Sequence, residues 1–527
     1  MKKKISSLCI LFFVLYVRLV SAQPDGSIVK FSELSFKNDP ERSAFEKYNT
    51  SKEKTEAFDL LFCTYDKSKT SDKAAALKRI EECVAYLKKE TAGKNDIKKV
   101  KFTYDYVHKQ FLKIYKEKNG FMDLFESGEY NCLSASALYA IIFSKISIPY
   151  QIRETPTHVY LIAYPDSEKI LIETTSPAKG YYQFNSTYVN NFVKNLYDSK
   201  VITKEEYEST PASDLFNKHY FTSEGVSLFE LSGLQYSNFA IYSIGQEDIK
   251  NACEEVKKAM FIFPCEKHQY ILKSTLASLI GKNGYNDPES VQDLVILCRF
   301  NNAKDKQITN SVVLSEFSDL LQAQLIKNSN YDLFEKSYTQ LTNTLTDSAL
   351  KSDISFGYHY ELGRLGYSNS KSMDYVLGHL SAAYKLNPLN ANLRSMILDA
   401  MGQQLRKLND TKEIMAQTDS FALQYDFVKE NEMYVNIKAN CYLDLAYQDY
   451  FYGNVTKGDA NIKKFEEMIK SKNTASAVAS LVEKAFAQGA IEYYKKGNYA
   501  KAKKMLETGL VYAPNNFGLE RRLSQFK

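Results

Sequence analysis

The chain has 527 residues, 13% of them aromatic and none of them Trp, and its 68 basic and 63 acidic side chains give a net charge of +5. Four of the basic residues lie within the first 22 positions, so 64 basic side chains stand against 63 acidic ones in the rest. This near-neutral balance argues against a nucleic-acid-binding protein, which needs a basic surplus. The length predicts two or three domains.

Residues 1–22 are expected to be a secretory signal peptide. Three lysines at positions 2–4 precede a short apolar run at 10–16, and a small-residue cleavage signal ends at Ala22. The apolar run is too short to span a bilayer, and Arg18 interrupts its far end. We therefore expect export to the periplasm or cell envelope, with no transmembrane span once the signal is removed. An uncleaved anchor is the alternative.

Residues 23–95 are predicted to form a helical segment that packs on the core of the protein. Apolar side chains recur there at the three- and four-residue spacing of an amphipathic helix. They include Phe58, Leu61, Phe62, Ile80, Val84 and Leu87. The whole chain has only 11 Pro and 21 Gly residues, which interrupt helices, so we expect a mostly α-helical protein.

Residues 96–205 are predicted to be an α+β domain whose first helix carries an apolar stripe. The stripe consists of Val100, Phe102, Tyr104, Val107, Phe111 and Ile114. A loop with Gly128 follows, and Cys132 then opens an apolar helix that ends before Pro149. Gly128 allows a close approach of the backbone just before the cysteine. Because a helix N-terminus stabilises a thiolate, Cys132 is the candidate nucleophile.

Strands are expected at 150–153, 157–164 and 169–174, and the last two form a hairpin. The turn between them has an even number of residues, so the numbers of paired residues sum to an odd value. His158 and Glu173 then lie on one face of the sheet, directly opposite or one diagonal step apart. A Cys, a His and an acid in this order predict a thiol activated by an imidazole that the carboxylate orients.

Seven cysteines follow the signal peptide, and an odd count leaves at least one free thiol in an exported protein. Cys132 is the candidate for that thiol. Cys63 and Cys83 lie on successive helical stretches where a disulfide can bridge a hairpin, and so do Cys253 and Cys265. Buried free thiols fit the same positions equally well. No Cys or His spacing is typical of a zinc site, and we expect neither a metal nor a cofactor.

Residues 206–230 are predicted to be a linker, and residues 231–527 an all-helical region that contains a repeat. Six positions of one copy recur 250 residues later with similar side chains. The pairs are Tyr236 and Phe486, Ala240 and Ala490, Ala252 and Ala502, Val256 and Leu506, Ala259 and Gly509, and Pro264 and Pro514. A third, partial copy has Tyr360, Leu380, Ala383 and Pro388.

This pattern resembles the tetratricopeptide repeat, in which two helices pack through aromatic and small residues and a proline follows the second helix. About six to eight helical hairpins fit in residues 231–527 at the repeat length of that family. The resemblance implies an all-α solenoid whose concave face binds a protein or a peptide. A non-repetitive helical bundle is the alternative.

Residues 96–180 resemble the transglutaminase-like superfamily, whose core is related to that of papain-type thiol proteases. The family shows a Tyr-Asp-x-Val helix, a Gly shortly before a Cys that opens a helix, a helix end of Gly-Ile-Pro type, a His on a strand, and a strand that ends in Asp-Pro-Thr. These positions correspond here to Tyr104–Val107, Gly128 and Cys132, Ile146–Pro149, His158, and Glu173–Thr175. The chain departs from the pattern in its longer Gly-to-Cys spacing, in Glu173 instead of Asp, and in having no Trp as an oxyanion donor.

The resemblance implies that Cys132 is the nucleophile, His158 the general base and acid, and Glu173 the orienting carboxylate. A tetrahedral intermediate also needs donors for its oxyanion. The backbone N–H of Cys132, with the side chain of Asn131 or Gln110, is the candidate. We expect His108, in the preceding helix, to be structural.

The sequence therefore predicts an exported cysteine-dependent acyl-transfer enzyme with a repeat solenoid that binds protein or peptide. With water as acceptor it is a peptidase or amidase, and with an amine it is a transglutaminase; cell-wall peptides or surface proteins are candidate substrates by analogy of fold. The alternative is an inactive transglutaminase-like fold that acts as an envelope scaffold through its helical repeats.

Overall fold

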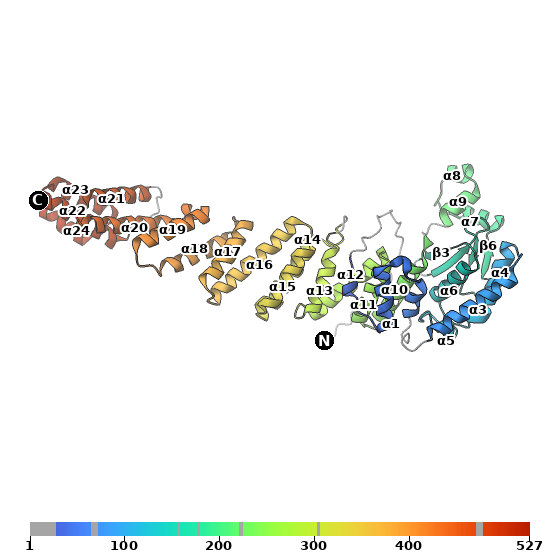
Figure 1. Cartoon of the computed structure of the whole chain (residues 1–527). Coiled ribbons are helices and arrows are strands. Elements are labelled where there is room, and N and C mark those ends of the chain that lie inside the picture. The colour runs from blue at the N-terminus through green and yellow to red at the C-terminus, as the bar shows by residue number, and fades with distance from the viewer. Residues whose placement is uncertain are drawn as a thin grey trace, which may run out of the picture. The chain divides into compact units, whose positions relative to one another are not determined.

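The computed structural model describes residues 28–64, 72–155, 158–176, 180–220, 225–302, 306–470 and 478–526. The expected signal peptide and its cleavage site lie outside these residues. The described chain is mostly α-helical, as predicted, with one small antiparallel sheet (Figure 1). It divides into two compact units, Met1–Leu345 and Thr346–Lys527.

The first unit begins with helices that pack on two different neighbours. α1 (Asp39–Thr50) and α2 (Ala57–Cys63) lie against α10 (Leu228–Gly245), and the turns η1 (Phe31–Glu33) and η2 (Lys52–Lys54) lie against α1. In contrast, α3 (Lys73–Thr91) packs against α4 (Asp96–Phe111) and α6 (Cys132–Lys145). The six apolar residues named above for this segment are all buried.

A buried network of charges joins α1 to α10 and α11 (Ile249–Ile262). Glu41 Oε1 accepts a hydrogen bond from the Tyr236 hydroxyl at 2.9 Å and another from Lys258 Nζ at 3.0 Å. Lys258 also pairs with Glu255 at 3.5 Å. Phe45 packs edge-on against the Tyr236 ring at 5.6 Å. Because a buried charge is costly unless it is paired, these contacts hold the N-terminal segment on the helices rather than on the sheet.

The predicted apolar helix before the cysteine is α4, and it begins at Asp96 with Asn95 as its N-cap. Four residues of the predicted stripe, Val100, Tyr104, Val107 and Phe111, are buried on it. Ile114 differs, because α4 ends at Phe111 and Ile114 is 57% exposed in the short strand β1 (Ile114–Tyr115). β1 pairs in parallel with β2 (Glu129–Tyr130), and α5 (Asp123–Glu126) lies between them in the chain.

The antiparallel sheet has five strands in the order β6-β5-β4-β3-β7. They are β3 (Tyr150–Thr155), β4 (His158–Ala163), β5 (Ile170–Ile172), β6 (Tyr181–Gln183) and β7 (Gly225–Val226). The three predicted strands correspond to β3, β4 and β5, and Thr157 lies outside the described residues. α6 packs on β3 and β4, which buries Val159 and Leu161 beneath the helix that begins with Cys132.

Most of the predicted linker, residues 206–230, is folded. α7 (Ser186–Asp198), α8 (Lys204–Ser209) and α9 (Ala212–Tyr220) precede β7, and α10 begins two residues after that strand. β7 pairs with the edge of β3 through Ile152↔Val226 and Arg153↔Gly225. The helices α10 to α15 also belong to the first compact unit, so the chain divides after Leu345 and not near residue 206.

The three copies of the predicted repeat are three helical hairpins. They are α10–α11, α16 (Ser348–Ser368) with α17 (Met373–Leu386), and α22 (Ala479–Lys495) with α23 (Tyr499–Tyr512). In each copy the residue after the second helix donates its N–H to the same aligned position, which is Ala259, Ala383 or Gly509. A side chain at Gly509 would lie 3.0 Å from Phe486 on the partner helix, which explains the small residue where the helices cross.

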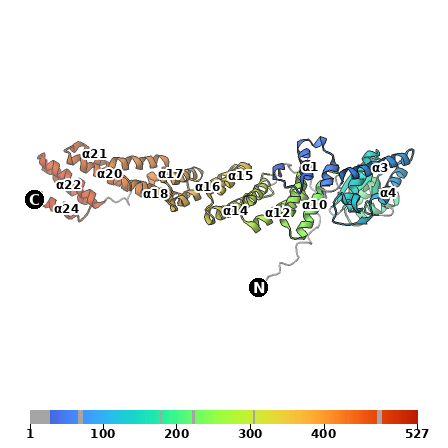
Figure 2. The same ribbon diagram turned by 60° about the horizontal axis from the view of Figure 1, so that its bottom comes forward.

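The remaining helices pack mainly against their neighbours in the chain (Figure 2). In the first unit they are α12 (Glu266–Asn283), α13 (Pro288–Arg299), α14 (Asn310–Leu321), which continues as the π-helical η3 (Gln322–Lys327), and α15 (Tyr331–Thr344). In the second they are α18 (Ala391–Leu405), α19 (Thr411–Gln424), η4 (Asp426–Glu430), α20 (Glu432–Phe451), α21 (Val455–Lys470), α24 (Phe517–Leu523) and η5 (Ser524–Phe526). Among the described helices, none combines the length and apolar character that crossing a bilayer requires.

Candidate active site

Cys132 is the first residue of α6, as predicted. Asn131 caps the helix: its Oδ1 accepts from the Ser134 N–H at 2.9 Å, while Ser134 Oγ accepts from the Asn131 N–H at 3.0 Å. This reciprocal cap fixes where the helix begins. The first N–H groups of a helix have no carbonyl partner within it, so the backbone at Cys132 presents a positive partial charge.

The turn before the cysteine depends on Gly128, whose φ is +76°. Its carbonyl accepts hydrogen bonds from the N–H groups of Lys113 and Ile114, at 2.8 and 3.1 Å. A Cβ at this position would lie 2.5 Å from Lys113 Cγ. The close backbone approach predicted for Gly128 is therefore present, and it is made with the segment that follows α4.

None of the seven described cysteines forms a disulfide. Cys63, Cys83 and Cys253 are buried, and burial raises the pKa of each to about 12. Cys265, which is partly exposed, has a pKa of about 11 for the same main reason. The two disulfides left open by the sequence are thus not formed, and free thiols occupy those positions. Cys132 is also partly exposed, and its side chain interacts with the His158 imidazole.

His158 and Glu173 meet as the hairpin parity predicted. The register pairs Leu161 with Ile172 and Ala163 with Ile170, so residue numbers sum to an odd value. His158 opens β4, and Glu173 directly follows β5, one diagonal step away. Their side chains are 31% and 26% exposed, and Nε2 of the imidazole lies 2.8 Å from Oε2 of the carboxylate.

The other oxygen of Glu173 is held by Thr175. Oε1 accepts from the Thr175 backbone N–H at 3.1 Å and from its hydroxyl at 2.5 Å. Burial alone raises the pKa of the carboxyl group, but the hydrogen bonds from His158 and Thr175 outweigh it, so the pKa is lowered. Glu173 therefore stays ionised and fixed in orientation beside the imidazole.

His158 interacts with the Cys132 side chain as well as with Glu173. The interaction with Cys132 is the largest influence on the pKa of His158, followed by the hydrogen bond to Glu173, and together they raise it to about 10 despite burial. Since Glu173 occupies Nε2, Nδ1 is the ring nitrogen left for the thiol. A protonated imidazole between a sulfur and a carboxylate is the arrangement that stabilises a thiolate.

The two side chains predicted as oxyanion donors, Asn131 and Gln110, have different surroundings. Both polar groups of the Asn131 side chain are used in the fold, because its Nδ2 donates to the Glu117 carbonyl at 3.0 Å while its Oδ1 caps α6. Gln110 is exposed near the end of α4. His108 is buried with Nδ1 2.8 Å from the Tyr139 hydroxyl, and desolvation lowers its pKa to about 4, which fits the structural place expected for it.

Two tyrosines near the thiol were not singled out by the sequence. Tyr115 on β1 and Tyr242 on α10 each have a raised pKa, first because of burial and then in part because of the charge of Cys132. For Tyr242 the pKa is about 12, and its hydroxyl donates to the Glu117 carbonyl at 2.8 Å. No sequence pattern indicates that α10 lies beside Cys132.

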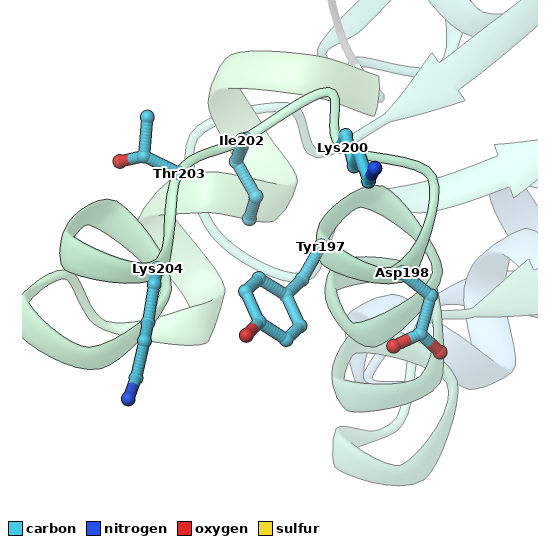
Figure 3. A pocket seen from close by; sticks show the side chains of 6 residues that line it. All are labelled: Tyr197, Asp198, Lys200, Ile202, Thr203 and Lys204. Atoms are coloured by element: carbon cyan, nitrogen blue, oxygen red, sulfur yellow. The ribbon is translucent and has the colours of Figure 1, made fainter.

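A surface hollow of about 500 Å³ is formed by other residues, around the turn between α7 and α8 (Figure 3). Its lining residues are Tyr197, Asp198, Lys200, Ile202, Thr203 and Lys204. It has no Cys or His in its lining, so it offers neither a thiol nor an imidazole. None of Cys132, His158 and Glu173 lines this hollow.

Comparisons with known proteins do not place the chain in a family. No protein-family model matches it, and no curated protein sequence matches it. The candidate active site consequently depends on the geometry of Cys132, His158 and Glu173 and on the chemistry of these side chains.

Proposed function

We propose that the region 96–205 is a transglutaminase-like domain that catalyses acyl transfer through a thioester at Cys132. The observation that carries the proposal is the position of His158, which lies beside the Cys132 side chain and is hydrogen bonded to Glu173. A structural histidine in a sheet needs only one such partner. Here the chain supplies a partly exposed sulfur, an imidazole and an anchored carboxylate in contact.

In the first half of the reaction, Cys132 Sγ attacks the carbonyl carbon of an amide, and a sulfur–carbon bond forms. The negative charge that develops on the carbonyl oxygen is stabilised by donors at the start of α6, with the Cys132 N–H as the candidate. The imidazolium of His158 then gives its proton to the departing amine as the carbon–nitrogen bond breaks. The result is a thioester and a neutral imidazole.

In the second half, the acceptor attacks the thioester while His158 takes its proton. The carbon–sulfur bond breaks, and the thiolate and imidazolium are restored. Water as acceptor gives a peptidase or amidase, and a primary amine gives a transglutaminase. Glu173 keeps Nε2 hydrogen bonded throughout, which leaves Nδ1 directed to the sulfur.

We further propose that the helical hairpins bind a protein or peptide partner and that the protein acts in the cell envelope. The small residues Ala259, Ala383 and Gly509 support a repeat of tetratricopeptide type, because each accepts the hydrogen bond that ends the second helix of its hairpin. The alternative, an inactive domain that serves as a scaffold, shares these hairpins. The two functions therefore differ only in what Cys132 does.

A generic acyl donor distinguishes them. Incubation of the full chain with p-nitrophenyl acetate is expected to release a burst of p-nitrophenolate and to leave one acetyl group on the peptide that contains Cys132. Cys132→Ala abolishes the burst, whereas Cys265→Ala, at the other partly exposed cysteine discussed above, leaves it unchanged. Acetylation that does not depend on Cys132 or on His158 would favour the scaffold.

A further inference from the structure

The segment 116–122, between β1 and α5, lies beside the first residue of α6. The Glu117 carbonyl accepts a hydrogen bond from Asn131 Nδ2 at 3.0 Å, and Asn131 is the N-cap that precedes Cys132. The same carbonyl accepts a second bond from the Tyr242 hydroxyl at 2.8 Å. One backbone oxygen thus joins the cap of the nucleophile helix to α10.

A second contact between α10 and this segment is buried. Gln235 Nε2 donates to the Asn119 carbonyl at 2.8 Å, and the two residues are 2% and 3% exposed. The Lys118 Nζ also lies 5.9 Å from the centroid of the Tyr242 ring. Three successive residues of the segment therefore contact α10. The Asn119 residue is buried, and its carbonyl would be left unsatisfied without its donor, so this contact is costly to break, whereas Glu117 is exposed.

We infer that α10 is part of the catalytic unit, and that Tyr242 is a positioning residue that holds the Glu117 carbonyl and, through it, Asn131 at the start of the nucleophile helix. The inference rests on the acyl-transfer function proposed above. It assigns to the first helical hairpin a role in catalysis besides any binding of a partner.

The physical basis is the small tolerance of nucleophilic catalysis for misplacement. Asn131 sets where α6 begins, and the beginning of α6 sets where Sγ and the Cys132 N–H lie relative to His158. Without the Tyr242 hydroxyl, the Glu117 carbonyl becomes more mobile. Asn131 Nδ2 then donates to a less fixed acceptor, and the position of the N-cap is less well defined. Loss of one such hydrogen bond changes the equilibrium between the positioned and the displaced cap about fivefold. A displaced nucleophile lowers the reaction rate further.

The full chain with Tyr242→Phe tests this inference, because the change removes one hydroxyl and keeps the ring. Tyr270→Phe is the matched control, since Tyr270 is 72% exposed on α12. Gln235→Met is a second variant, which removes the other donor from α10. Thermal unfolding establishes that each variant is folded before its rate is compared.

Two measurements are made on each variant: the rate and pH profile of Cys132 alkylation by iodoacetamide, and hydrogen exchange in a peptide that spans 116–134. Tyr242→Phe is expected to slow alkylation at neutral pH at least about fivefold, to change the pH profile, and to speed exchange in this peptide. Tyr270→Phe is expected to change neither measurement.

Unchanged alkylation and exchange in Tyr242→Phe and Gln235→Met would overturn the inference while leaving the proposed function intact. Faster exchange with an unchanged alkylation profile would also overturn it, because the contact would then be structural only. A His158→Ala variant separates the two failures: if wild-type alkylation is unaffected by that change, the proposed function fails first and the role of Tyr242 in catalysis fails with it.

Discussion

The sheet region of the first unit and the helical hairpins of the second unit use histidine in opposite ways. His158 is partly exposed between Cys132 and Glu173, and these two partners raise its pKa to about 10. His359 on α16 and His379 on α17 face each other with their Nδ1 atoms 3.0 Å apart, and burial lowers the pKa of both. The candidate catalytic histidine thus has partners that stabilise its charged form, whereas burial disfavours the charged form of the structural histidines, although all of them make polar contacts.

The cysteines of the two regions differ in the same way. Cys132 stands at a helix N-terminus beside an imidazole and is partly exposed. Cys441, within α20 of the second unit, is buried, and burial raises its pKa to about 11. A thiol is reactive as a thiolate, so the environment of Cys441 suppresses reaction. The following predictions test whether this contrast is real, in order of decreasing effect.

Replacing the nucleophile should have the largest effect. In the full chain, Cys132→Ala is expected to abolish the fast phase of alkylation by iodoacetamide, because the remaining described thiols lack an imidazole partner. Cys441→Ala is expected to leave the fast phase unchanged. Mass spectrometry of the alkylated peptides measures both. A fast phase that persists in Cys132→Ala would place the reactive thiol elsewhere.

Replacing the imidazole should have the next largest effect. His158→Ala is expected to slow alkylation of Cys132 at neutral pH by about 10²-fold, the scale of a positioned proton-transfer group. His379→Ala is the matched control, since it removes a histidine that lies in the other unit. Equal rates in wild type and His158→Ala would show that the imidazole does not activate the thiol.

The carboxylate should contribute less. Glu173→Gln keeps an oxygen that can accept from Nε2 but removes the charge, so we expect a decrease of about tenfold in the same rate. Glu173→Asp restores the charge on a side chain one methylene shorter and should recover part of the loss. A decrease as large in Glu173→Asp as in Glu173→Gln would indicate that reach, and not charge, matters at this position.

The smallest effect is expected at the histidine pair of the second unit. An unfolded histidine has a pKa of about 6.5, and burial lowers the pKa of His359 and His379 in the fold. When the pH falls below the unfolded pKa, the unfolded hairpin binds more protons than the folded one. The folded hairpin therefore loses stability as the pH falls through the folded pKa values.

Hydrogen exchange in peptides from α16 and α17, corrected for the intrinsic pH dependence of exchange, should therefore show less protection at about pH 5 than at about pH 7. The hairpin α22–α23 has no histidine and is the internal control. His379→Gln should reduce the difference. Equal protection of both hairpins at the lower pH would contradict the prediction.

The local parts of the site were predictable from the sequence. A glycine turn and an apolar run are local signals, so they placed Cys132 at a helix start, whereas the N-cap role of Asn131 was not predicted. The parity of a hairpin turn is also local, so it placed His158 and Glu173 on one face before any distance was known. The three hairpins could be aligned in the sequence because Ala259, Ala383 and Gly509 are each followed five positions later by a proline.

The parts that depend on packing between distant segments were not predictable. β7 is only two residues long, so no alternation of side chains predicts that Gly225 and Val226 extend the sheet. Tyr242 reaches Glu117 only because α10 packs beside the start of α6, and neither residue lies in a motif. Gln110 is exposed near the end of α4, and its exposure depends on packing that no local pattern in the sequence indicates.

The central claim is that His158 activates the Cys132 side chain as a nucleophile, and the pH profile of Cys132 alkylation in the full chain tests it most directly. An ordinary thiol, with a pKa of about 8.5, is almost fully protonated at about pH 6. Because the pKa of His158 is raised to about 10, the imidazolium is present throughout this range, and we expect wild-type Cys132 to react rapidly at about pH 6 and His158→Ala to lose that reaction. Superimposable profiles that both rise only in the range of an ordinary thiol would contradict the claim.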